Sequence, residues 1–213
     1  MIVFGTRNTR RTLATGEFAC PKCGVDRTYR HIRAKRWGHI FFIPLIPLGE
    51  GTEMVQCDVC KTNFSPDVLG APTSSQFADE LNQTVQLLVM TAVAGGVADR
   101  HVRAESARSF LASRGWGPAE VEATVGWALD ADVEQSGELS AQLLRQIAKV
   151  APRLEPQGVE QLVMSFGWIV ASDGAFGPEK AALVAELGRS AGLTAAHVQG
   201  IVSTVEQSVR PAG

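Results

Sequence analysis

The sequence predicts an α+β protein with two domains, a small β domain over residues 1–70 and an all-helical domain over residues 71–213. Residues 1–70 are rich in aromatic, β-branched and turn residues, whereas the remainder is rich in Ala, Leu, Val, Glu and Gln at helical spacing. The charge changes at the same place. Residues 1–70 hold ten Lys and Arg against six Asp and Glu, a net charge of +4, and the remainder carries −6. A basic head and an acidic body predict two parts with different tasks.

The first domain is predicted to be a small β module. Its clearest strand candidates are Ile2-Val3-Phe4 and Ile40-Phe41-Phe42-Ile43, short runs of β-branched and aromatic residues. The segment from Gly70 to Ser75 has the glycine, proline and serine content of a linker or a helix start. We therefore place the domain boundary after residue 70.

Glycine and proline residues divide the second domain into about seven helices. Pro118 and Pro178 suit first helical positions, and Glu120 and Glu179 in the first turns favour the positive end of the helix dipole. The apolar residues Val159, Leu162, Val163 and Phe166 show the helical spacing. The dividing segments are Gly95-Gly96, Gly115 to Pro118, Ser136-Gly137, Pro152 with Pro156, Gly174 to Pro178, and Gly192.

Two stretches of the helical domain resemble each other. Val97 to Glu105 and Ala171 to Glu179 each contain an Asp, an apolar residue three positions later and a Glu six positions later. Each stretch then enters a helix that ends at a glycine. We expect two related helix pairs.

The four cysteines form two CxxC pairs, Cys20-Pro21-Lys22-Cys23 and Cys57-Asp58-Val59-Cys60. Two residues between cysteines let a tight turn present both sulfurs to one ion, and zinc takes four such ligands in a tetrahedron. Gly24, directly after the first pair, suits a turn that needs positive φ. Phe18 and Phe64 flank the pairs and are expected to pack beneath the metal. The sequence predicts one structural zinc ion held by Cys20, Cys23, Cys57 and Cys60.

Two alternatives to structural zinc stay open at this point. A dithiol redox pair would use one CxxC, but neither pair lies in the βαβ setting typical of that motif. A catalytic zinc keeps a position open for water, and His31 or His39 would then replace a cysteine ligand. Four cysteines already complete the shell, which favours the structural site.

The first domain resembles zinc ribbons in its CPxCG and CxxC knuckles, at Cys20 to Gly24 and Cys57 to Cys60. More narrowly, it is similar to bacterial zinc-ribbon proteins in three motifs, at Tyr29 to His31, Arg36 to Gly38 and Phe41 to Gly49. The resemblance covers most of residues 1–65. It implies a fold and no activity.

The segment Trp37 to Leu48 is too apolar for an ordinary surface loop and too short to span a bilayer. Packing against the rest of the protein would bury it. Alternatively, the basic residues before it and its aromatic side chains would contact an anionic membrane surface or a protein partner. The same residues suit nucleic acid, which we rank lower because a charge of +4 is modest and the acidic domain opposes it. The candidate contact residues are Arg33, Lys35, Arg36, Trp37, Phe41 and Phe42.

The helical domain carries a second resemblance. The segment Val170 to Glu179, followed by a helix and Thr194, resembles the TerB-like domains of tellurite-resistance proteins. The resemblance implies a helical bundle over residues 76–210, acidic ligands for a divalent cation such as calcium, and a role in membrane-associated stress responses to metals. Its candidate ligands here are Asp99, Glu105, Asp173 and Glu179. Carboxylates in turns and first helical turns also stabilise a fold without any metal.

The sequence contains no glycine-rich phosphate loop, nucleophile elbow or HExxH motif, so we predict no enzymatic activity and identify no small-molecule substrate. The N-terminus lacks the pattern of a standard export signal, and no run reaches the ~18 apolar residues of a spanning helix. We expect a cytoplasmic protein, at most peripheral at the inner membrane face. Its predicted function is that of a zinc-binding scaffold with protein partners, and the alternative is a nucleic-acid-binding zinc-ribbon adaptor.

Overall fold

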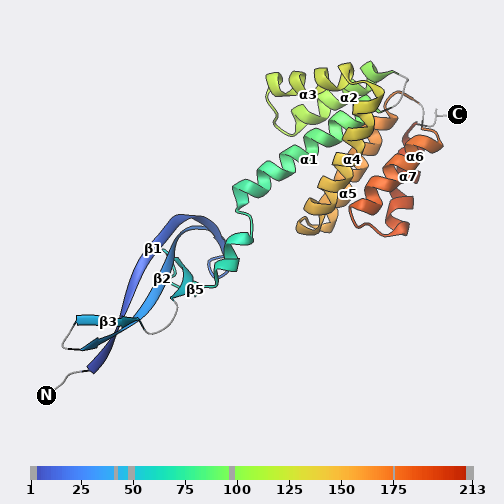
Figure 1. Ribbon diagram of the computed structural model, residues 1–213. Helices are drawn as coiled ribbons and strands as arrows, with labels where there is room; N and C mark the ends of the chain where they lie inside the picture. Colours follow the sequence, from blue (N-terminus) through green and yellow to red (C-terminus); the bar gives the residue numbers. More distant parts are fainter. Residues whose placement is uncertain (1–3, 41–42, 48–50, 96–98, 175, 210–213) are drawn as a thin grey trace. The chain divides into compact units, whose positions relative to one another are not determined.

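A computed structural model of the chain describes residues 4–40, 43–47, 51–95, 99–174 and 176–209. The chain forms two compact units, Met1–Asp79 and Glu80–Gly213. The first holds an antiparallel sheet and the second is built of helices, which confirms the predicted α+β fold (Figure 1). The division lies inside helix α1 (Ser74–Ala94), and the domain boundary after residue 70 stays a prediction.

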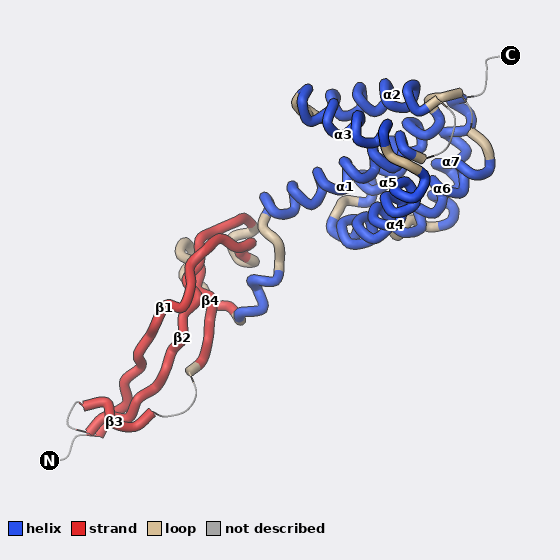
Figure 2. The backbone as a smooth tube through the Cα atoms, turned by 45° about the horizontal axis from the view of Figure 1, so that its top comes forward, coloured by secondary structure: helices blue, strands red, loops and turns tan. Residues whose placement is uncertain are grey.

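The β unit is organised around one long hairpin. Strands β1 (Phe4–Cys20) and β2 (Val25–Ile40) pair along almost their whole lengths (Figure 2). The other edge of β2 pairs with two strands in succession, β4 (Thr52–Cys57) and β3 (Ile43–Pro47). The short strand β5 (Asn63–Phe64) pairs with β4. β2 is therefore the central strand of the sheet.

The register of the sheet corrects one predicted strand. Ile40 is the last residue of β2, Ile43 is the first residue of β3, and the two residues face each other as an antiparallel pair. The strand predicted over residues 40–43 is therefore divided between two strands, and Phe41 and Phe42 themselves lie outside the described residues. A bulge between Thr12 and Ala14 leaves Leu13 without a register partner in β2.

Seven helices follow in the described part of the chain, in agreement with the prediction. After α1 they are α2 (Arg100–Ser113), α3 (Pro118–Asp130), α4 (Val133–Val150), α5 (Pro156–Ala171), α6 (Pro178–Ser190) and α7 (Ala195–Val209). The chain also forms two short 3₁₀ helices in the described residues, η1 (Pro66–Gly70) and η2 (Ala151–Arg153).

One predicted helix break is wrong. Ser136 and Gly137 lie inside α4, because Asp132 and Gln135 form a capping box that begins the helix before them. The Asp132 carboxylate accepts a hydrogen bond from the Gln135 backbone N–H at 2.8 Å, and the Gln135 side chain accepts one from the Asp132 N–H at 3.0 Å. The cap outweighs the low helix propensity of one glycine.

The helix pairs α2–α3 and α6–α7 are joined by turns of the same design. Each turn contains a glycine with positive φ, +83° at Gly115 and +79° at Gly192. In each, the next residue donates its N–H back to the preceding helix, from Trp116 to Leu111 at 3.2 Å and from Leu193 to Gly188 at 3.0 Å. These Schellman-type ends support the predicted relation between the two pairs.

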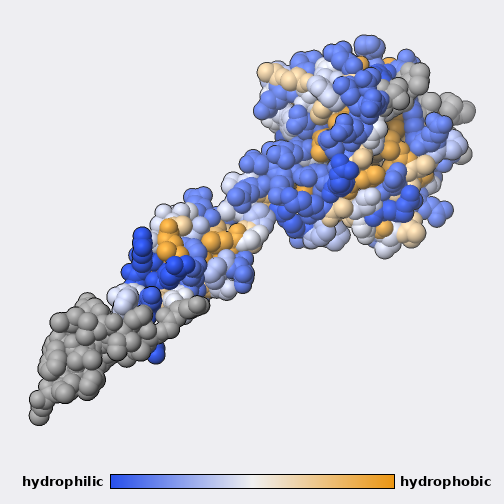
Figure 3. Space-filling view, in the orientation of Figure 1, coloured by the Kyte–Doolittle hydropathy of each residue, from blue (hydrophilic) through white to orange (hydrophobic). Residues whose placement is uncertain are grey.

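Helix α5 lies in the core of the helical unit and contacts α2, α6 and α7. The predicted apolar positions Val159, Leu162, Val163 and Phe166 are all buried. On the face of the helical unit shown in Figure 3, hydrophilic residues predominate and hydrophobic residues show in patches between them. The helices are amphipathic, as the sequence pattern predicts.

Candidate metal centre

The first cysteine pair lies where β1 ends. Cys20 is the last residue of β1, and Cys23 lies in the turn that leads into β2. Gly24 closes this turn with a φ of +70° and donates its N–H to the Cys20 carbonyl at 2.9 Å. Glycine adopts this φ without steric cost, which is the role that the sequence predicts for it.

The second pair repeats this geometry at the end of β4. Cys57 is the last residue of β4, and Lys61 donates its N–H to the Cys57 carbonyl at 3.1 Å with a φ of +57°. A non-glycine residue in this conformation is uncommon. Asp58 donates its N–H to the Thr28 carbonyl of β2 at 3.0 Å, so the knuckle is tied to the hairpin.

The two knuckles bring their four sulfur atoms together. All four Sγ atoms lie within 4.8 Å of one another, and those of Cys20 and Cys60 are 3.9 Å apart. Zinc–sulfur bonds of about 2.3 Å in a tetrahedron place the sulfurs about 3.8 Å apart. A disulfide would need about 2.05 Å, and all four cysteines are free thiols. The spacing fits one zinc ion.

An aromatic cluster packs against the cysteines. Phe18 is buried with Cys20 and Cys57, and its ring meets Tyr29 and Phe64 edge-on, with centroids 5.6 Å and 6.0 Å away. The register places Tyr29 opposite Cys57. Phe18 and Phe64 therefore pack against the cysteines, and their position beneath a metal stays a prediction.

Thr62 lowers the pKa of one cysteine, a role that the sequence pattern does not predict. The hydroxyl and the backbone N–H of Thr62 donate to the Cys60 sulfur and lower the pKa of that thiol to about 6. Burial and the neighbouring thiols raise the pKa of Cys23 to about 11. The pKa values of two of the four thiols are therefore shifted in opposite directions, and a thiol must lose its proton before it can bind zinc.

Residues 18–84 match a zinc-ribbon family. The matched segment contains both knuckles, the aromatic cluster and the start of α1, and it ends ahead of most of the helical unit. No curated protein and no solved structure shows a significant match to the chain. The β unit is accordingly called the ribbon below.

Among the residues that the structure describes, the four cysteines are the one group of three or more His, Cys, Asp or Glu side chains that could share a metal ion. His31 of the ribbon is not in this group, and its Nε2 lies 2.9 Å from Glu53 Oε2 instead. The side chain of His39 lies outside the described residues. The candidate metal ligands in the described residues are therefore the four cysteine thiols.

The four carboxylates expected to bind a second metal are not brought together. The side chain of Asp173 is 1% exposed, and both of its oxygens accept hydrogen bonds from Lys180. Glu105 lies at the surface and accepts from Arg108 at 2.8 Å. Asp99 and Glu179 are exposed. Lysine already occupies the oxygens of Asp173 that a cation would need, so the geometry gives calcium binding no support.

The residues expected to contact a membrane or a partner have different environments. Arg33 pairs with Glu53, Lys35 lies over the ring of Trp37, and Arg36 is exposed. Phe41 and Phe42 lie outside the described residues. In the described part of the chain, no helix combines the length and the apolar character needed to cross a membrane.

Proposed function

We propose that the protein is a non-catalytic zinc-binding scaffold, in which one zinc ion braces the ribbon and the ribbon presents its long hairpin to a partner. The observation that carries this proposal is the set of four cysteine sulfur atoms that lie within 4.8 Å of one another. Four thiolates fill the coordination shell, whereas a catalytic zinc keeps one position open for water. The metal supplies folding free energy to a module whose buried core is small.

Elemental analysis of the purified chain tests the proposal. We expect about one zinc ion per chain, and loss of the metal in Cys57→Ser. Val59→Ser is the matched control, because Val59 lies in the same knuckle and is 60% exposed. A wild-type ribbon that folds without metal would overturn the proposal.

A finer proposal concerns the helical unit, which we assign to a TerB-like role in a membrane-associated response to tellurite or other metals. It is supported by the resemblance around Val170 to Glu179 and by the two similar helix pairs α2–α3 and α6–α7. Survival of a tellurite-sensitive bacterial host that expresses the chain is the direct test. Protection by the wild type and not by Cys57→Ser would support a role for the intact protein, and absence of protection would remove it.

A further inference from the structure

The ribbon has a groove on its long hairpin, away from the turn that holds the first cysteine pair. Its volume is about 680 Å³, and it lies along β1 and β2 beside Glu53 of β4. The residues used below all line it: Thr9, Arg10, Arg11, Arg33, Lys35 and Trp37. The zinc site does not include any of them. The groove is therefore a second feature of the ribbon, and the metal affects it only by holding the hairpin.

The strand register gathers the positive charge into a line. Arg11 faces Arg33 across the hairpin and Thr9 faces Lys35, so these residues share one side of the sheet. Successive positions on one side of a strand repeat every ~6.8 Å, a spacing comparable to that between phosphates of an extended nucleic-acid strand. Glu53 pairs with Arg33. Within the described residues, no carboxylate pairs with Arg10, Arg11 or Lys35.

Trp37 is held at one end of this line of charge. Its indole N–H donates to the Thr9 hydroxyl at 3.0 Å, and that hydroxyl donates to the Lys35 carbonyl at 3.2 Å. The Lys35 ammonium lies 5.1 Å from the centroid of the Trp37 ring. These contacts fix the ring with a cation over one of its faces, so a base would stack on the opposite face while the cation neutralises a phosphate.

The form of the site favours a linear polyanion over a lipid surface. A membrane-inserting tryptophan directs its indole N–H to the headgroups, but the N–H of Trp37 is bonded within the sheet. The cations line a hollow that runs along two strands, which suits a strand lying within it and suits a flat bilayer poorly. Bases must be unpaired to reach the ring, because those of a duplex are stacked on one another.

We propose that this groove binds single-stranded nucleic acid, with Arg11 and Lys35 on the phosphates and Trp37 stacked on a base. The inference rests on the proposed function in one respect, which is that zinc folds the hairpin. It adds the class of partner that the scaffold would bind.

Fluorescence anisotropy of the full, zinc-loaded chain with labelled oligothymidine of about 10 nucleotides tests the inference. We expect binding that weakens with salt, with a log–log slope that falls by about 0.7 for each phosphate contact removed. Lys35→Glu should weaken binding strongly. Trp37→Ala should weaken it about tenfold, as expected for one lost base stack, and Trp37→Phe should restore part of that loss.

Arg36→Glu is the matched control for Lys35→Glu. The two residues are adjacent in β2, the charge change is identical, and Arg36 is exposed and faces Asn8 in the register. Equal losses of oligonucleotide affinity in the two variants would show that the oligonucleotide is attracted to the charge of the whole ribbon. That result would overturn the proposal that the groove is the binding site. Absence of oligonucleotide binding would overturn it too, and binding to phosphatidylserine vesicles alone would assign the hairpin to a membrane surface.

Zinc content, measured in every variant, keeps the two proposals distinguishable. A wild type that contains zinc but does not bind oligonucleotide would contradict nucleic-acid binding by the groove. The proposal of a zinc scaffold would be unaffected. A wild type without zinc that binds oligonucleotide through Lys35 and not through Arg36 would contradict the proposal of a zinc scaffold. It would support nucleic-acid binding by the groove.

Discussion

The ammonium group of Lys180 donates hydrogen bonds to both carboxylate oxygens of Asp173, at 2.5 Å and 2.6 Å. The Asp173 side chain is 1% exposed, and the Nε of Arg103, also 1% exposed, lies 3.8 Å from it. Burial lowers the pKa of Arg103, and the Asp173 charge opposes that shift. This carboxylate therefore compensates two cations from α2 and α6, and we interpret it as a structural group of the helical unit.

Asp173→Asn should destabilise the helical unit by about 3 kcal/mol, because it removes the negative charge that two cations share in the interior. Urea unfolding followed by helical circular dichroism measures this loss. Glu179→Gln is the control, since Glu179 is exposed and its change should stay within about 0.5 kcal/mol. If both variants unfold at the same urea concentration as the wild type, Asp173 has no such role.

The contrast between Asp173 and the cysteines shows which features of a site are readable from a sequence. The cysteine ligands are recognisable because each half-site is a local turn, so the spacing of two residues already determines how both sulfurs point. Asp173 meets Arg103, which is remote in the sequence, through the packing of α2 against α5. The sequence shows Asp173 and the neighbouring glycine but not the arginine that faces the carboxylate in the fold, so the resemblance predicts a metal there instead.

The groove on the hairpin was missed for a related reason. The sequence pattern indicates Lys35 and Trp37 as contact residues but not Thr9 and Arg11, because only the strand register shows which residues lie opposite one another. A bulge at Leu13 shifts that register by one residue. A one-residue shift moves a strand's side chains to the other side of the sheet, so the composition of this face does not follow from the strand sequences alone.

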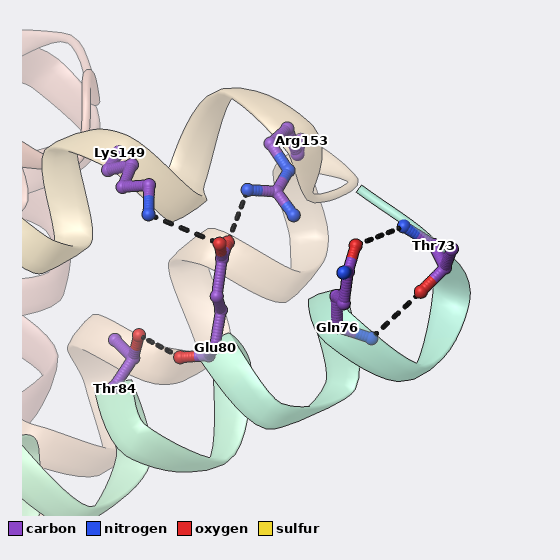
Figure 4. A network of polar contacts seen from close by, with 6 residues as sticks. All are labelled: Thr73, Gln76, Glu80, Thr84, Lys149 and Arg153. Atoms are coloured by element: carbon purple, nitrogen blue, oxygen red, sulfur yellow. Dashed lines mark hydrogen bonds and ion pairs between the residues drawn. The ribbon is translucent and has the colours of Figure 1, made fainter. Parts of the chain in front are cut away.

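Glu80 joins α1 to the end of α4 and to η2 (Figure 4). Its carboxylate accepts from Arg153 and from Lys149, at 2.5 Å and 3.1 Å, and these cations lower the pKa of Glu80. Because the folded pKa lies below the unfolded one, the pair stabilises the fold above the unfolded pKa of about 4.3. This contribution is lost as the pH falls through the lowered folded value.

Glu80→Gln should therefore lower the urea midpoint of the helical unit at neutral pH, and the difference from the wild type should shrink as the pH falls below about 4.3. Glu160→Gln, at an exposed position of α5, serves as the control and should show no such dependence. A difference that persists undiminished in acid would mean that Glu80 acts through packing and not through its charge.

Gly167 of α5 lies against Val205 of α7. A Cβ atom at this position would lie 2.7 Å from Val205 Cγ2, which is too short for a van der Waals contact. Gly167→Ala should destabilise the helical unit by about 1 kcal/mol or more, since overpacking outweighs the gain in helix propensity. Gly126→Ala, in α3, meets no atom within 4 Å and should stabilise the unit by up to about 1 kcal/mol.

The double variant Gly167→Ala/Val205→Ala separates the clash from other effects of the substitution. Truncation of Val205 removes the methyl group that the new Cβ meets, so the double variant should be more stable than the sum of the two single changes predicts. Additive losses would show that the crowding against Val205 is not the cause.

Removal of zinc should unfold the ribbon and leave the helical unit folded. Tyr29 is the one tyrosine of the chain and packs against Phe18 beside the cysteines, so its near-ultraviolet and NMR signals report on the ribbon. We expect a strong chelator to abolish the native Tyr29 signals, because the ribbon core is small and the metal supplies much of its stability. The helical circular dichroism should persist, since the core of the helical unit is far larger and contains none of the zinc ligands. Cys57→Ser should reproduce the chelated state, and Val59→Ser should not. Native Tyr29 signals in protein shown to be free of zinc would mean that Phe18, Tyr29 and Phe64 fold the ribbon alone.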